Sequence, residues 1–203
     1  PAVVAHKWPG FVFTGSMSEA EKDRMLEETS VIHAMEQIDA DGTVHYFGKD
    51  GREELVLSAE EAAAYQQQQI AAHDRAVCQS TTLVDVSTMP FIPNSVTELA
   101  VDADGHFAEF AFGNAHMVLL YPENSTGFDL RTGDTVTISL DADARGSLGF
   151  GLFKDGIYVS EEVVSAQGHL YTFKIEEDGR YCFFVENCSA GMYICTDGSL
   201  TVN

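Results

Sequence analysis

Residues 79–203 consist of short β-rich runs separated by Pro, Gly, Asn and Asp, and this pattern constrains the fold more than any other feature. In DTVTISL (134–140), Val136, Ile138 and Leu140 alternate with polar residues, as in a strand with one buried face. No segment of helical length and period follows. The other candidate strands are residues 81–87, 95–101, 106–112, 116–121, 147–153, 156–160, 170–175, 180–186, 192–195 and 200–202. This spacing predicts an antiparallel β-sandwich or jelly roll.

The preceding residues, 1–78, have a different pattern. The S-x-x-E capping box of Ser18 and Glu21 predicts a short helix to about residue 28. A second box, Ser58 with Glu61, opens an alanine- and glutamine-rich run that predicts a helix to about residue 77. Turn sequences between them predict a three-stranded antiparallel meander at residues 31–38, 43–48 and 53–57. The expected fold class is therefore α+β: an N-terminal α+β part with two helices, followed by the sandwich.

The charge balance narrows the choice of partners. The chain carries 11 Lys and Arg against 32 Asp and Glu, a net charge of −21 at pH 7. Such a surface repels phosphate backbones and anionic lipids, so no nucleic-acid partner is expected. The apolar stretch at 115–121 is far shorter than the ~20 residues of a membrane span, so direct membrane insertion is not expected either. A start at Pro1 favours a segment of a longer protein.

Three of the four cysteines, Cys182, Cys188 and Cys195, lie close together in the sequence. Their spacing matches neither zinc pairs nor a redox C-x-x-C motif. A hairpin within residues 181–196 would place Cys182 opposite Cys195, and a disulfide there would suit an oxidising compartment. A Cys188–Cys195 bond, or a bond to Cys78, stays open. Small buried hydrophobes are the other interpretation.

Acidic pairs in turn sequences are the candidate metal ligands. Asp102 with Asp104, and Asp141 with Asp143, supply carboxylates of the kind that coordinate Ca²⁺ in extracellular β modules. Neither pair completes an EF-hand loop, and DADG is also a common turn sequence. Calcium is thus the one cofactor that the sequence suggests, and no other cofactor is expected.

Sequence motifs for catalysis are missing. The chain has no G-x-S-x-G, H-E-x-x-H, Walker A, G-x-G-x-x-G or S-x-x-K pattern. Two carboxylates across a cleft could still hydrolyse a glycan, and exposed aromatic residues could bind one. A glycan-active hydrolase or carbohydrate-binding module is therefore the alternative to a non-catalytic module.

Two stretches resemble known bacterial families. LRTGDTVTISL and HLYTFKIEEDGRYCFFVENC are similar to the small jelly-roll modules of secreted proteins, including pre-peptidase C-terminal-type domains. DADGTVHYFGKDGREELVLSAEEAAAY and PFIPNSVTELAVDADGHFAEFAFGNAHMVLLYPENS look like the extracytoplasmic C-terminal regions of BlaR1/M56-type membrane proteins of Firmicutes. The second resemblance implies a sensory or accessory module outside the membrane, with the family's zinc peptidase motif in another part of the protein.

The expected function is a non-catalytic extracytoplasmic sensory or ligand-binding module, tethered through a missing N-terminal segment. Its partner would be a peptide, a glycan or a neighbouring protein. Two observations would separate the alternatives. A deep cleft holding two carboxylates would favour the hydrolase, whereas an exposed sheet edge or a shallow aromatic patch would favour binding.

Overall fold

The computed structural model describes residues 2–4, 35–48, 50–142, 146–165 and 169–203. The chain divides into two compact units, residues 1–76 and 77–203. The predicted helix of residues 18–28 lies outside the described residues.

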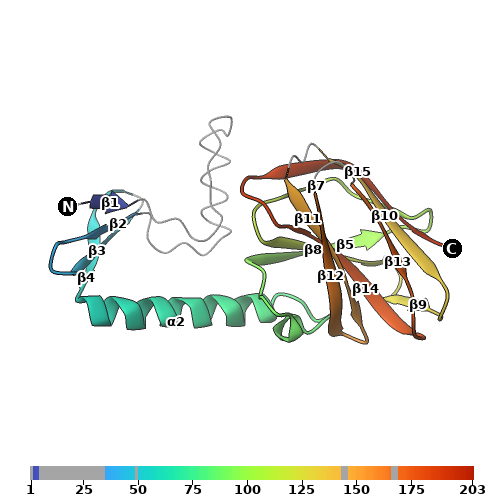
Figure 1. Cartoon of the computed structure of the whole chain (residues 1–203), viewed down its shortest axis with the longest axis horizontal. Coiled ribbons are helices and arrows are strands. Elements are labelled where there is room, and N and C mark those ends of the chain that lie inside the picture. The colour runs from blue at the N-terminus through green and yellow to red at the C-terminus, as the bar shows by residue number, and fades with distance from the viewer. Residues whose placement is uncertain (1, 5–34, 49, 143–145, 166–168) are drawn as a thin grey trace. The chain divides into compact units, whose positions relative to one another are not determined.

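The N-terminal unit contains a four-stranded antiparallel sheet and the helix α2 (Figure 1). Ser58 caps α2 as its sequence predicts: Glu61 N donates to Ser58 Oγ (3.4 Å), and Ser58 N donates to Glu61 Oε2 (3.0 Å). Ala62 and Tyr65 of α2 pack against Tyr46 of the sheet. The elements are β1 (Ala2–Val4), β2 (Met35–Ile38), β3 (Val44–Phe47), β4 (Glu53–Leu57) and α2 (Ala59–Cys78).

The C-terminal unit contains two sheets (Figure 1). The five-stranded sheet has the order β13 (Leu170–Lys174), β10 (Thr135–Ala142), β15 (Tyr193–Val202) and β6 (His106–Phe107), with β7 (Phe110–Phe112) also paired to β15. The second sheet has the order β12 (Ile157–Ser165), β11 (Ser147–Lys154), β14 (Gly179–Asn187), β8 (His116–Pro122) and β5 (Ser95–Val101), with β9 (Phe128–Leu130) paired to β14. Every described pair is antiparallel except β5 with β8, which is parallel.

One apolar cluster joins the two sheets. Ile138 and Leu200 of the five-stranded sheet share it with Phe150 and Phe183 of the six-stranded sheet, and all four side chains are at most 3% exposed. Burying an aliphatic or aromatic side chain of this size contributes about 1.5–3 kcal/mol, so this cluster is the main source of stability for the unit.

The six-stranded sheet also buries part of its other face. Phe153 and Phe184 form a second cluster with Val77 and Val86, which belong to the segment that precedes β5. Since β11 and β14 are covered on both faces there, their sequences are nearly continuous apolar runs rather than alternating ones. This segment includes a short 3₁₀ helix, η1 (Val86–Thr88).

The β-rich character of the C-terminal part and the helix α2 are confirmed, and most predicted strands lie within two residues of the observed ones. The predicted strand at 81–87 is wrong. Asp85 accepts a hydrogen bond from Ser87 N and caps η1, so this segment covers the sheet instead of joining it. The predicted strand at 106–112 is two strands, β6 and β7, and the two predicted at 192–195 and 200–202 are one continuous strand, β15. The sequence did not predict β9.

Candidate functional site

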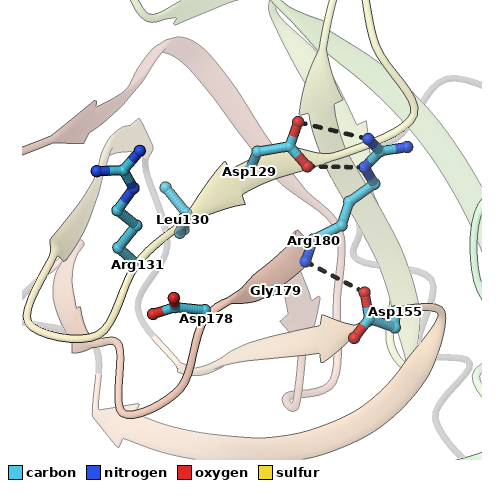
Figure 2. Close-up of a pocket in the computed structure, with 7 residues that line it drawn as sticks. All are labelled: Asp129, Leu130, Arg131, Asp155, Asp178, Gly179 and Arg180. Carbon is cyan, nitrogen blue, oxygen red and sulfur yellow. Dashed lines mark hydrogen bonds and ion pairs between the residues drawn. The ribbon is translucent and has the colours of Figure 1, made fainter.

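An open depression of about 540 Å³ lies at one end of the C-terminal unit, where β9, the β11–β12 turn and the start of β14 meet (Figure 2). Charged side chains of both signs line it: Asp129, Arg131, Asp155, Asp178 and Arg180. A second depression of about 530 Å³ shares two of these residues and continues toward residues 82–85.

The three carboxylates of this depression already accept hydrogen bonds. Arg180 Nε donates to Asp129 Oδ1 (2.9 Å) and Nη2 donates to Asp129 Oδ2 (3.4 Å), which gives a two-pronged ion pair (Figure 2). Asp155 Oδ1 accepts from the Arg180 backbone N (3.2 Å). Asp178 Oδ1 accepts from Thr132 N (2.8 Å) and Oγ1 (2.9 Å), and these hydrogen bonds lower the pKa of Asp178.

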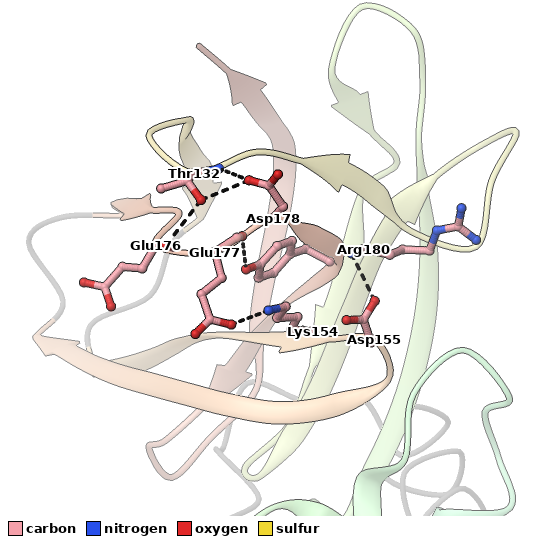
Figure 3. A network of polar contacts seen from close by, with 8 residues as sticks. Thr132, Lys154, Asp155, Glu176, Glu177, Asp178 and Arg180 are labelled. Carbon is pink, nitrogen blue, oxygen red and sulfur yellow. Dashed lines mark hydrogen bonds and ion pairs between the residues drawn. The ribbon is translucent and has the colours of Figure 1, made fainter.

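The same network fixes the neighbouring loops (Figure 3). Lys154 pairs with Glu177, and Tyr181 Oη donates to the Glu177 carbonyl (2.7 Å). Asp155 and Gly156 have φ of 51° and 83°, as a two-residue type I′ hairpin turn requires. The side chains of this depression therefore hold the loops, and none of the four carboxylates named here remains poised for chemistry.

The predicted calcium ligands do not converge in the described part of the chain. Asp102 Oδ1 accepts from Asp104 N and His106 N, both at 2.9 Å, and so closes its own turn. Asp141 lies on β10, while Asp143 is outside the described residues. Among the described residues, no three acidic, His or Cys side chains are grouped to hold a metal. Calcium binding stays a prediction.

The expected cysteine hairpin is wrong. Cys182 lies on β14 of the six-stranded sheet and faces the second cluster, whereas Cys195 lies on β15 of the five-stranded sheet and faces the central core. Cys182, Cys188 and Cys195 form no disulfide with any described cysteine. Burial raises the pKa of Cys182 and Cys195 to about 11, and burial with the nearby Glu161 carboxylate raises that of Cys188 to about 12. None of these three thiols is a thiolate at neutral pH.

The free edge of β12 is the second candidate site. Within the described residues β12 pairs only with β11, and its nine residues make it the longest edge strand of the unit. Ile157, Val159 and Val163 are each more than half exposed, at 51%, 52% and 54%. A long edge with exposed apolar side chains is a ready template for an added strand.

Two hydrogen bonds show which way the backbone of this edge points. Cys188 N donates to the Ser147 carbonyl (3.0 Å), and Asp155 N donates to the Arg180 carbonyl (2.7 Å). Because backbone groups alternate in direction along a strand, the odd-numbered residues of β11 bond to β14 and the even-numbered ones face β12. Through the register, Ser160 and the even-numbered residues after it on β12 face β11.

The backbone groups of Glu161 and Val163 therefore point outward, away from β11. Nearer the start of the strand the edge is closed, because Tyr158 N donates to Thr88 Oγ1 (2.9 Å) of η1. The part of β12 that is open for pairing begins after this contact.

Two glutamates lie on the outer face of the sheet beside this open part. Glu161 and Phe184 are both opposite Gly151, so Glu161 shares a face with the second cluster, and Glu186 lies two residues further along β14. The Glu161 carboxylate lies over Gly149, where a Cβ would overlap it. Cys188 Sγ is 3.7 Å from Glu161 Oε1.

Both carboxyl groups are partly buried. Burial raises the pKa of Glu161, and burial together with the Glu161 charge raises the pKa of Glu186 to about 7. No Lys, Arg or His of the described residues forms an ion pair with either glutamate. Half-buried acids are ordinarily compensated by a cation, so this pair is an unusual feature of the surface.

Sequence analysis missed this site, although one signal was present. YVSEEVVS places two glutamates inside an apolar run, as in a strand whose edge carries charge. The approach of Glu161 to Glu186 depends on β11 lying between them, and pairing across strands cannot be read from the local sequence.

Comparisons with known proteins do not assign a family. No family model matches the chain, and no curated protein matches it. Among solved structures, Aeromonas hydrophila PliG, a periplasmic lysozyme inhibitor of g-type lysozyme, is similar over 54% of this chain and 100% of its own, with 12% identity and a TM-score of 0.36. A similarity at this level transfers neither partner nor location. No helix of the described residues is long and apolar enough to cross a membrane.

Proposed function

We propose that this chain is a non-catalytic module that binds a protein partner outside the cytoplasm, as part of a larger, membrane-anchored bacterial protein. The observation that carries the proposal is the open edge of β12, where exposed apolar side chains adjoin outward-pointing backbone groups. An added strand would gain affinity from main-chain hydrogen bonds and specificity from its alternate side chains. A protein segment can form those bonds, whereas a glycan cannot continue a sheet.

Several features support binding over catalysis. The carboxylates of the open depression already accept hydrogen bonds from Arg180 and Thr132. The thiols of Cys182, Cys188 and Cys195 have raised pKa values, which disfavours nucleophilic chemistry.

A glycan-active hydrolase is the second candidate, because Glu161 and Glu186 are two carboxylates on one face and the pKa of Glu186 is raised to about 7 by burial and by Glu161. Glycosidases use such a pair across a cleft, with one acid kept protonated. Neither glutamate lines the two depressions described above. The pair therefore fits a binding surface better than a cleft for a sugar.

The location and the tether rest on the resemblance to extracytoplasmic regions of membrane proteins, and on the acidic composition, which disfavours anionic intracellular partners. The gene region upstream of Pro1 tests both. A membrane-spanning helix followed directly by this segment on the outer side is the expected arrangement, and a cytoplasmic enzyme domain fused there would contradict it.

Site-specific photo-crosslinking in cells tests the binding function. A photoreactive residue at Val159 on β12 should give an adduct with one defined protein, whereas the same residue at Leu170, which is 56% exposed on the edge strand β13, should not. Equal labelling at both positions would contradict a specific edge. Turnover of a soluble glycan that is lost on Glu186→Gln would establish the hydrolase instead.

A further inference from the structure

We propose that the open edge of β12 binds an extended cationic segment of a partner protein, whose Lys or Arg side chain lies against Glu161 and Glu186. This inference rests on the proposed function and adds the chemistry of the partner. Three features of the edge carry it: the direction of its backbone groups, the uncompensated glutamates on its outer face, and the charge of the unit.

The backbone sets where the segment pairs. Glu161 and Val163 each direct N–H and C=O away from β11, while Tyr158 N is taken by Thr88. An antiparallel segment would therefore exchange hydrogen bonds with Glu161 and Val163. Strands pair about 4.8 Å apart, so the incoming side chains would lie directly beside those of β12.

The glutamates set which side chain fits. The side chain of Glu161 points to the outer face and lies back over Gly149, which is paired with Glu186. The Glu161 charge therefore contributes to the raised pKa of Glu186. An incoming residue opposite Glu161 would project onto this face as well. A Lys or Arg there would neutralise a half-buried carboxylate that no described cation neutralises in the free chain.

The other groups on this face would not supply that charge. Tyr158 and the thiol of Cys188 are the titratable neighbours, and both have pKa values raised by burial and by the two carboxylates. On β11 the residues that face them are Gly149 and Gly151, which carry no side chain. Arg180 lies on the same face of β14, but it is six residues from Glu186 and is already paired with Asp129.

A second copy of the chain fits this edge less well. The fullest antiparallel self-pairing of the open part of β12, residues 159–165, is centred on Glu162 and would place that residue opposite its own copy, with Glu161 close by. Like charges directly opposite each other destabilise a sheet. Residues 79–203 carry 18 acidic and 5 basic side chains, so two copies also repel each other while a cationic partner is attracted.

The test uses the whole chain and a displayed library of random twelve-residue segments. Binders are selected on the unmodified chain and then measured, as synthetic peptides, on Val163→Pro, which removes an outward N–H, and on Val163→Thr, which keeps it. We expect binders enriched in Lys and Arg, with alternating apolar residues. We also expect affinity to fall by about tenfold or more on Val163→Pro and to change little on Val163→Thr.

The double variant Glu161→Gln, Glu186→Gln tests the cation site separately. It should weaken the selected peptides by about fivefold to tenfold and flatten the dependence of their affinity on salt. Glu162→Gln, on the opposite face of the same strand, is the matched control and should leave affinity nearly unchanged. Circular dichroism and thermal unfolding check that every variant folds.

The outcomes separate the two proposals. Edge-dependent binders that are neutral or acidic, or that are indifferent to the double glutamate variant, would overturn the cationic partner and leave the binding function intact. Three results would overturn edge binding of a foreign segment altogether. The selection could yield no binders, or the binders could keep their affinity on Val163→Pro. Analytical ultracentrifugation could also show a dimer that Val163→Pro dissociates.

Discussion

At the scale of single residues, Glu186 makes the stability of the protein depend on pH. Burial and the Glu161 charge raise the pKa of Glu186 from an ordinary 4.5 to about 7, so the folded state holds a proton that the unfolded state releases. Between these two pH values the folded chain binds more protons than the unfolded chain. The free energy of unfolding therefore falls as pH rises from about 4.5 to about 7, and this contribution is constant above that range.

Glu186→Gln should accordingly stabilise the protein at pH 8 by roughly 1 to 3 kcal/mol, since one pKa unit corresponds to about 1.4 kcal/mol, and should change little at pH 5. Urea unfolding at the two pH values measures the difference. Glu162→Gln, exposed on β12, is the control and should show no such pH dependence. A Glu186→Gln protein with the same stability as wild type at pH 8 would contradict the destabilising role assigned to this carboxylate.

At the scale of secondary structure elements, the alternation of backbone direction along β12 makes neighbouring residues respond differently. In the free chain the amide protons of Glu161 and Val163 should exchange with solvent rapidly, while those of Glu162 and Val164, which face β11, should be protected. Hydrogen exchange followed by NMR resolves the four amides. Uniform protection across them would show that the edge is covered.

Proline substitution gives the matching energetic test. Val163→Pro removes only an outward N–H and should cost little stability, because proline is tolerated at edges. Val164→Pro removes a bond to β11 and disturbs a side chain that packs on the central core, and should cost roughly 2 to 4 kcal/mol. Thermal unfolding of the two variants distinguishes them, and equal losses would refute the assigned directions.

How far the sequence reveals these elements depends on what each strand packs against. β10 buries one face, and its period of two gave its position within two residues. Residues 81–87 have the same alternation, yet they form no strand, and Val84 and Val86 pack on the outer face of the six-stranded sheet. The edge position of β12 and the approach of Glu161 to Glu186 depend on the order of strands, which local patterns do not encode.

At the scale of the whole molecule, the six-stranded sheet is apolar on both faces and needs the segment before β5 as well as its partner sheet. Met117 and Phe184, both fully buried, lie on the outer face under Val86 and Met89. Removing that cover would expose a contiguous apolar surface, which monomeric proteins rarely tolerate.

Two truncations test this dependence. A fragment of residues 70–203 keeps Val77 and the whole covering segment, and should unfold cooperatively with the near-ultraviolet dichroism of a packed aromatic core. A fragment of residues 95–203 keeps every strand of both sheets but loses the cover. It should bind a hydrophobic dye, aggregate, or melt at least about 10 °C lower, because several buried side chains lose their contacts. Equal melting of the two fragments would mean that the outer cluster adds nothing to the stability of the sheet.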